Sequence, residues 1–492
     1  MNFNQYRSTK LSKIIAKCSC IALISVFFVN NSISQRKIAY NPDQKFSPAQ
    51  LQTDFQLLRT AIEQFHPGAF LYTPKDSVER YFNLYLATLN DSLTERQFRN
   101  QLMKVTEIIK CGHSGISSSD RRQKYFKNRP YKMIPLDLCF VDSQLYILSN
   151  FSKDSSLRKG MQILEIEGIA VGDIFKTMYE ANGSDGWNGS NRLYAFQHNV
   201  EFQYNRFYPE KDTFHLIIKD TLNRAVSTRL AAMLSDSLPF TKGKPKKSIY
   251  TNDRNRFFLY EKDSTVAVLD LYAEEVFGYN RFYRKSFRYL KKHQINKLVI
   301  DLRGNGGGFL LNPGVLLGYL LDSSDHILIW REKKYIPFKD HLVGRKFVGI
   351  TEAFFPLLPH VIRDRSNKSR FNLMVQFKPR KKWHFDGSLE VLIDGGTFSA
   401  ATCIAAYLKK YNRARFIGQE TGGAASGCNA FLTPYLILPE TKLKYMLPLY
   451  RVENQVVAEK FGRGVFPDIE TMYNIQDILQ GRDLEFLHIN DQ

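Results

Sequence analysis

The spacing of hydrophobic positions changes along the chain and divides it into three regions. Between residues 47 and 110, apolar side chains recur every three or four positions, which predicts amphipathic helices, and Thr94 with Gln97 forms a capping box before the last of them. Residues 131–230 contain short strand-like runs separated by turns. From about residue 257, apolar strand-like runs alternate with helical stretches, which is typical of an α/β domain with a largely parallel, covered sheet.

The N-terminal residues have the pattern of a secretory signal peptide. Four basic residues precede an apolar run at positions 21–29, and small residues follow at Ser32 and Ser34. An uncharged run of nine residues falls short of the roughly 20 that span a bilayer, and a membrane anchor is the alternative interpretation. We therefore predict a signal peptide over residues 1–34, export to the periplasm or the extracellular space, and no stable membrane insertion.

Charge and cysteine content narrow the possible partners. The formal net charge is +21, but the basic residues are spread along the chain and form no nucleic-acid-binding motif. The cysteines after the apolar run, Cys111, Cys139, Cys403 and Cys428, do not have the spacing of a metal site. We therefore expect neither a nucleic-acid partner nor a bound metal.

A glycine-rich turn is the first candidate for chemistry. Residues 297–308, KLVIDLRGNGGG, read as a buried strand followed by three consecutive glycines. The N–H groups of such a turn can face inward and hold an anion or a developing oxyanion. A tight turn with a helix cap and a nucleotide-phosphate loop are the alternatives, although neither phosphate-loop spacing is present.

A serine at the start of a helix is the second candidate. In residues 389–410 a strand ends at Asp394, two glycines follow, and a helix of small residues begins near Thr397 with Ser399 in its first turn. A serine there lies at the carboxyl edge of the sheet, near free N–H groups and the positive end of the helix dipole. It could attack a carbonyl group, or Thr397 or Ser399 could simply cap the helix.

A histidine in a flexible turn is the third candidate. His113 lies in the Gly- and Ser-rich run KCGHSGISSS, which follows a long predicted helix. A single histidine is a weak signal, because most histidines are structural or on the surface. This one lies between two predicted regions, from where it could reach a nucleophile elsewhere in the chain.

Together these segments resemble a known family. The strings LVIDLRGNGGG, VLIDGGTFSAATCIAAYLKK and FIGQETGG have the order and spacing of the tail-specific, or carboxy-terminal processing, serine proteases, over about residues 266–468. The final FGRGVFPDIE is similar to the terminal signature of that family. The family includes tricorn-core and retinoid-binding-protein-like branches, and the second branch contains binding proteins without catalytic activity.

The resemblance implies an α/β fold with three domains after the signal peptide. Residues 43–125 would form an N-terminal helical domain that carries the catalytic histidine, residues 131–235 a PDZ-like β-rich domain, and residues 250–480 a ClpP/crotonase-like protease domain. The segment RKGMQILEIEGIAV at 158–171 is similar to the core of a PDZ domain, with a plain β-turn-β spacer as the alternative.

The resemblance also implies catalytic residues. Ser399 falls on the nucleophile of the family. Ala424 occupies the position of the lysine base used by one branch, which excludes a Ser–Lys dyad because alanine cannot take a proton. The tricorn-like branch uses a histidine, which His113 matches, and a glutamate near the end of the domain, for which Glu459 is the first candidate and Glu453 the second.

The implied activity is that of an exported serine peptidase. Ser399 would form an acyl-enzyme with His113 as general base, and the amides of Gly306 or Gly307 and of Ala400 would hold the oxyanion, without a metal or an organic cofactor. The substrate would be a peptide or protein, bound by strand addition at the PDZ-like domain, for example through its C-terminus. The alternatives are a catalytically inactive peptide- or ligand-binding protein on the same scaffold and an envelope scaffold that acts through the PDZ-like region.

Overall fold

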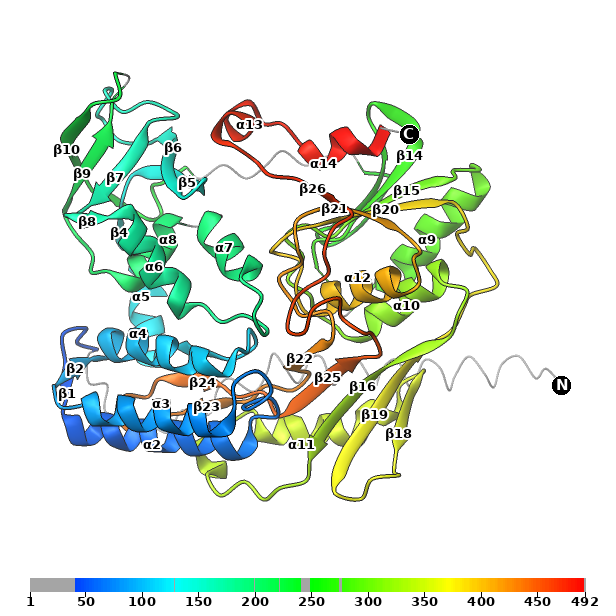
Figure 1. The fold of residues 1–492 in the computed structure, drawn as a ribbon, viewed down its shortest axis with the longest axis horizontal. Helices are drawn as coiled ribbons and strands as arrows, with labels where there is room; N and C mark the ends of the chain where they lie inside the picture. The colour runs from blue at the N-terminus through cyan, green and yellow to red at the C-terminus, as the bar shows by residue number, and fades with distance from the viewer. Residues whose placement is uncertain are drawn as a thin grey trace.

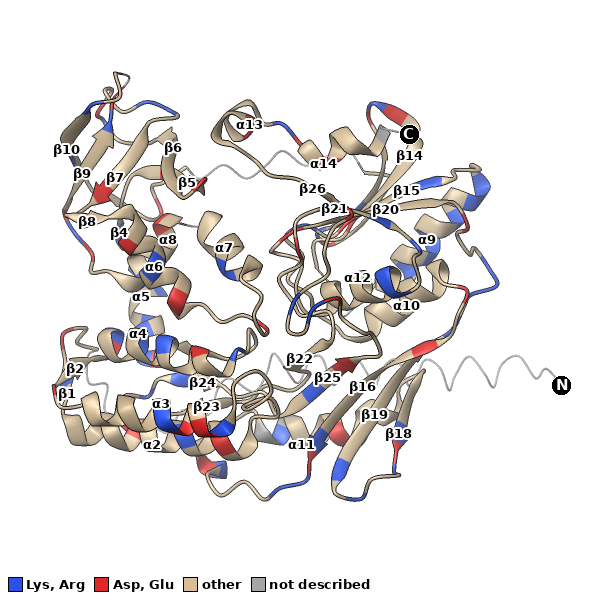
Figure 2. Cartoon of the chain, viewed as in Figure 1, with Lys and Arg blue, Asp and Glu red and all other residues tan. Residues whose placement is uncertain are grey.

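The computed structural model describes residues 40–490 apart from 128, 199, 221, 240–247 and 274–276 (Figure 1). The predicted signal peptide therefore lies outside the described residues. Among the described residues, no helix combines the length and the apolar character needed to cross a membrane. Lys and Arg are distributed over all three regions of the chain rather than along one element (Figure 2).

The first region is helical, as the hydrophobic spacing predicts. Ser47 caps the first long helix and forms a capping box with Gln50, and the predicted capping box of Thr94 and Gln97 starts a later helix. Leu51 and the other apolar residues on one face of the first helix are fully buried. The elements are β1 (Lys45–Phe46), α2 (Pro48–Phe65), α3 (Lys75–Thr88), β2 (Leu93–Thr94), α4 (Glu95–Thr106), η1 (Glu107–Ile109), β3 (Gly115–Ser117) and α5 (Asp120–Lys127).

The second region contains an antiparallel sheet in the order β10-β9-β7-β6-β5, with β8 paired to β7. Its strands are β5 (Leu136–Val141), β6 (Gln144–Asn150), β7 (Gln162–Ile166), β8 (Ile169–Ala170), β9 (Thr213–Lys219) and β10 (Ala225–Ala231). The short strands β4 (Lys132–Met133) and β11 (Met233–Leu234) pair beside it. The sequence analysis did not predict the helices α6 (Val171–Ala181), α7 (Ser190–Gln197) and α8 (Val200–Phe207).

The third region contains a seven-stranded sheet in the order β12-β13-β14-β15-β20-β21-β26, parallel from β14 to β26. The alternation of strands and helices predicted from the sequence is confirmed here. The strands are β12 (Tyr250–Asn252), β13 (Asn255–Tyr260), β14 (Asp263–Asp270), β15 (Lys297–Asp301), β20 (Ser388–Ile393), β21 (Arg415–Gly418) and β26 (Ile469–Glu470). The helices are α9 (Tyr279–Lys292), α10 (Leu311–Leu320) and α12 (Ala400–Lys410), and α13 (Ile475–Gln480), α14 (Leu484–Leu487) and η4 (His488–Asn490) follow the last strand.

Two further sheets complete the third region. One has the order β18-β19-β16-β25-β22 and the other the order β17-β23-β24-β3, so a strand from the first region belongs to a sheet of the third. The first sheet consists of β16 (Asp325–Glu332), β18 (Val361–Asp364), β19 (Arg370–Phe377), β22 (Gly427–Ala430) and β25 (Tyr450–Asn454). The second adds β17 (Leu342–Val343), β23 (Tyr435–Ile437) and β24 (Lys444–Met446) to β3, and η2 (Lys339–His341), α11 (Arg345–Phe354) and η3 (Phe355–Leu357) lie between β16 and β18 in sequence.

Two hydrophobic clusters hold these layers together. The larger includes buried side chains of all three regions, from Leu51 to Val465. The smaller covers the opposite face of the seven-stranded sheet, where Phe486 and Ile489 from the C-terminal end pack on Val266 and its neighbours. Because the larger cluster is continuous, the helical region is fixed against the sheet that carries the serine segment.

Candidate active site

Ser399 lies in the turn between β20 and α12, in a backbone conformation that serine rarely adopts. Its φ of 53° and ψ of −120° lie outside the regions that non-glycine residues favour. Such a conformation costs on the order of 1–3 kcal/mol and is most often found at functional sites. Ser399 is the N-cap of α12 but makes no capping hydrogen bond, and the Thr397 hydroxyl donates to the carbonyl of Leu302 at 2.8 Å. Capping therefore accounts for neither hydroxyl group.

Two glycine turns pack closely against Ser399. The φ of Gly307 is 93°, and a Cβ atom there would lie 2.7 Å from Ser399 Cβ and 2.9 Å from the backbone nitrogen of Ala400. A Cβ atom at Gly423 would lie 3.0 Å from the backbone nitrogen of Ser399. Only glycine permits such approaches without displacing the serine turn. The adjacent Ala424 is buried and offers no ionisable side chain.

The backbone N–H groups that are expected to hold an oxyanion differ in their hydrogen-bond partners. The N–H of Gly307 donates to Asn305 Oδ1 at 2.9 Å, so this donor is already used within the turn. Gly306 faces open space, since a Cβ atom there would meet nothing within 4 Å. Ala400 is the first residue of α12, where backbone N–H groups have no partner within the helix. The N–H of Gly307 is therefore engaged within the turn, and the N–H groups of Gly306 and Ala400 remain the candidates.

His113 lies beside the serine turn. Its ring stacks on the ring of Phe398, the residue before Ser399, with centroids 4.6 Å apart and an interplanar angle of 24°. β3 begins two residues after His113 and pairs with β24, with Gly115 opposite Met446. In Figure 1, helices α2–α4 of the first region accordingly lie against β23 and β24. The structure thus brings the predicted histidine segment to the predicted nucleophile.

Asp185 is the carboxylate that meets this histidine. Its Oδ2 atom lies 3.5 Å from His113 Nδ1, and its Oδ1 atom accepts the N–H of Gly112 at 2.9 Å. The residue is only 2% exposed. A Cβ atom at Gly112 would lie 2.7 Å from Phe398 Cζ and 3.3 Å from the Asp185 nitrogen, which explains why the residue before His113 is a glycine.

The two glutamates predicted to orient His113 have other surroundings. Glu459 is exposed, and Glu453 on β25 faces Arg451, with its Oε1 3.8 Å from Arg451 Nε. Asp185 is instead the carboxylate that the structure places beside His113, by its contact with Nδ1. The sequence offered little signal for Asp185, because it is one acidic residue in a loop recognised only by its Gly, Ser and Asn content.

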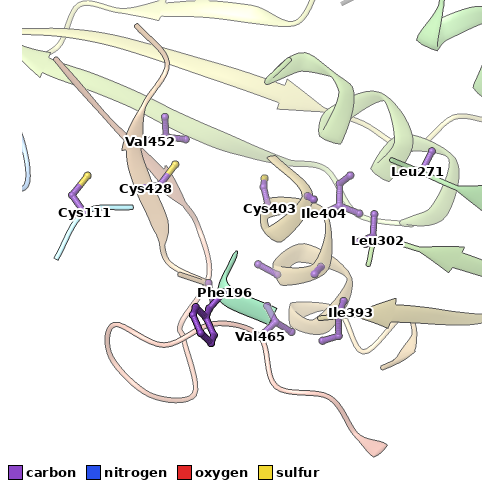
Figure 3. Close-up of a cluster of buried hydrophobic side chains, with 14 of the residues drawn as sticks. Cys111, Phe196, Leu271, Leu302, Ile393, Cys403, Ile404, Cys428, Val452 and Val465 are labelled. Atoms are coloured by element: carbon purple, nitrogen blue, oxygen red, sulfur yellow. The ribbon is translucent and has the colours of Figure 1, made fainter. Parts of the chain in front are cut away.

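Cys428 is a second neighbour of the histidine. It lies on β22 opposite Val452 of β25, and both are drawn in Figure 3 with Cys111 nearby. Burial lowers the pKa of His113, but the nearby Cys428 and Asp185 raise it, and the net pKa lies well above its ordinary value. The ring therefore holds its proton more tightly than a free histidine does.

A second, structural histidine lies behind this site. His66 Nε2 lies 3.0 Å from the hydroxyl of Ser114, the residue after His113. Burial and the positive charge of Arg451 lower the pKa of His66 to about 3, so its ring is neutral. Ser114 is thus bonded to His66, and it helps to fix the turn that carries His113.

Within the described part of the chain, one group of side chains could hold a metal ion, and it lies near the opposite end of β20 from Ser399. His384 Nε2 lies 3.2 Å from Asp322 Oδ1 and 3.4 Å from Asp386 Oδ1, and both carboxylates are exposed. These residues precede β20, whereas Ser399 follows it. The serine site and this group are therefore separated by the length of a strand.

Comparisons with known proteins identify the region that contains Ser399. Residues 267–471 match the sequence model of peptidase family S41. Mature CPAF in complex with lactacystin has a similar fold, with a TM-score of 0.63 at 14% identity over 90% of this chain and 99% of that one. Mature CPAF alone gives a TM-score of 0.61 at 15% identity over 90% and 96% of the two chains. The photosystem II D1 C-terminal processing protease gives a TM-score of 0.42 at 14% identity over 86% and 93%.

No curated protein matches the sequence. The match to the family covers the segments that bear the triple glycine, Ser399 and the terminal signature, and it leaves the region that contributes His113 outside it. Residues 267–471 are thus similar to peptidase family S41, whose sequence model they match.

Proposed function

We propose that the protein is an exported peptidase that hydrolyses peptide bonds through an acyl-enzyme on Ser399, with His113 as general base and Asp185 as the group that orients His113. The observation that carries the proposal is the convergence of these three residues. Ser399 is strained at the start of α12, His113 stacks on the residue before it, and Asp185 meets the Nδ1 atom of the histidine.

The proposed reaction assigns a role to each group. His113 Nε2 accepts the proton of the Ser399 hydroxyl while its oxygen attacks the peptide carbonyl, and the amides of Gly306 and Ala400 stabilise the oxyanion. The imidazolium then gives its proton to the leaving amine, and the acyl-enzyme forms. Water hydrolyses the ester by the same steps, with His113 again as base. Asp185 accepts from Nδ1–H and favours the charged ring.

The proposed substrate is a peptide or protein in an extended conformation. The second region offers an antiparallel sheet with β10 as an edge strand, most of whose residues are exposed. A free edge of this kind can accept an additional strand, which would hold a substrate segment through main-chain hydrogen bonds. Recognition of the C-terminal end of the substrate is part of this proposal.

A fluorophosphonate probe tests the nucleophile. We expect covalent labelling of the wild-type protein and loss of labelling in Ser399→Ala, because the probe reacts with an activated serine hydroxyl. Ser155→Ala, at an exposed position in the second region, serves as the matched control and should label as the wild type does. Labelling that survives in Ser399→Ala would overturn the assignment. Absence of labelling in the wild type, with peptide binding intact, would favour a catalytically inactive binding protein.

A further inference from the structure

A cavity lies between the helical region and the β-rich region, outside the serine site. Its volume is about 430 Å³. Its walls come from α4, α5 and α8, from the segment after α8 that includes Glu210, and from Pro42 and Asp43 before β1. In Figure 2, α4 and α5 carry basic residues where they face this junction. No role in the proposed peptidase reaction falls on this cavity.

Four arginines line the cavity without a carboxylate partner. They are Arg96, Arg122, Arg129 and Arg206. Among the described residues, none of the four forms an ion pair with an N–O distance of 4.0 Å or less. Arg122 donates to the Tyr40 hydroxyl at 3.2 Å instead, and Arg206 has Met103 Sδ at 3.9 Å.

The acidic residues of the cavity are fewer than the arginines. Asp43 and Glu210 line it, and Glu210 accepts the backbone N–H of Lys132 at 3.3 Å. Burial and the charge of Arg122 lower the pKa of Arg96, and burial lowers that of Arg206. Half-buried guanidinium groups that repel one another are costly unless an anion joins them.

Aromatic rings form the rest of the lining. The rings of Tyr125, Phe126, Tyr131, Phe202 and Tyr208 all face the cavity. The Arg122 guanidinium lies 4.6 Å from the centroid of the Phe126 ring, and the Arg129 guanidinium 5.5 Å from that of Tyr125. Flat apolar surfaces next to positive charge suit a ligand with a planar ring and an anionic group.

We propose that this cavity binds a small organic phosphate, in which a phosphate group is attached to a planar ring. Guanidinium groups match phosphate oxygens through paired hydrogen bonds, which a cluster of arginines can supply from several sides. The volume is that of a site for one small molecule rather than for a folded partner. The proposal goes beyond the peptidase function and does not depend on it.

Isothermal titration at low ionic strength tests the proposal on the full chain. The probes are adenosine 5′-monophosphate, inorganic phosphate and adenosine. We expect the monophosphate to bind at least about tenfold more tightly than inorganic phosphate, because the ring adds contacts, and adenosine not to bind measurably. Added salt should weaken binding, since the attraction is between charges. Equal affinity for all three probes, or no binding of the monophosphate, would overturn the proposal.

Variants of the cavity arginines test whether the monophosphate binds in this cavity. The double substitution Arg96→Gln with Arg122→Gln should weaken monophosphate binding at least about tenfold, because it removes two of the four charges. Lys124→Gln, on an exposed position of the same helix as Arg122, is the control and should bind as the wild type does. If the double variant does not fold, the exposed Arg129→Gln replaces it, with a smaller expected loss. Undiminished binding in a folded arginine variant would contradict the assignment.

Discussion

Gly112 has no side chain, and this lets the turn that carries His113 pack closely against Phe398 and Asp185. The position before His113 has no room for a Cβ atom beside Phe398 and the Asp185 backbone. The N–H of Gly112 donates to Asp185 Oδ1, and the other carboxylate oxygen lies beside the ring of His113.

A serine at position 112 should therefore lower the activity. We predict that Gly112→Ser lowers kcat/KM at least about tenfold, because Phe398 must move and His113 stacks on that ring. The measurement is hydrolysis of a fluorogenic peptide. Gly115→Ser is the matched control, since a Cβ atom there meets nothing within 4 Å and activity should be unchanged. Full activity in Gly112→Ser would contradict the assigned geometry.

The raised pKa of His113 predicts an alkaline activity profile. A general base must be unprotonated, so activity should increase as pH rises through the pKa of His113, which lies well above its ordinary value. We predict that the acid limb of kcat/KM lies at higher pH than that of an unperturbed histidine, which titrates near about 6.5. The pH–rate profile of peptide hydrolysis measures this limb.

The substitution Cys428→Ala tests how far the Cys428 thiol, as opposed to Asp185, raises the pKa of His113. Removing the thiol removes one of the groups that raise the pKa of His113, so the acid limb should move to lower pH while Asp185 still orients the ring. Cys403→Ala, at a buried cysteine on α12, is the control and should leave the limb in place. An acid limb that does not move in Cys428→Ala would mean that the thiol does not influence the histidine.

At the scale of elements, α2 is tied to the third region through one carboxylate. Asp54 is fully buried, and it accepts hydrogen bonds from the backbone N–H groups of Glu440 and Thr441 at 2.7 and 2.9 Å and from the Thr441 hydroxyl. These contacts hold the turn between β23 and β24, and β24 in turn pairs with β3. The helix thus supports the strand that follows His113.

Asp54→Ala should therefore reduce both stability and activity. We predict a loss of about 3 kcal/mol in the free energy of unfolding, because the buried donors lose their acceptor. Urea unfolding measures the loss, and the peptide assay should show lower activity as β3 loosens. Thr53→Ala, at the exposed neighbouring position, should change stability by no more than about 0.5 kcal/mol. Equal stability of both variants would show that Asp54 does not anchor the helix.

The elements that could be predicted are those with strong local signals. The capping box at Thr94, the buried parallel strands β15 and β20 and the helix after Ser399 all follow from local patterns of apolar, glycine and capping residues. The short helices α7 and α8 did not, because eight residues are too few to show a clear period. In α6, Val171, Ile174 and Met178 do recur at helical spacing, and the sequence analysis missed that helix.

At the scale of the whole molecule, the contacts that complete the site come from the continuous core. The sequence singled out Ser399 and His113 through motifs, but pairing of β3 with β24 and the arrival of Asp185 depend on packing between regions. Such contacts leave no local trace in one sequence, since they join segments with unrelated patterns. Asp185 and Cys428 were therefore found only in the folded molecule.

The pairing of β3 with β24 has a consequence for biosynthesis. The proposed nucleophile, base and orienting carboxylate come from three stretches of chain, and β3, which follows His113, pairs with a strand that ends at Met446. A ribosome must release that strand before the three groups can assemble as proposed. A polypeptide that stops short of Met446 is therefore expected to lack this arrangement and the activity that depends on it.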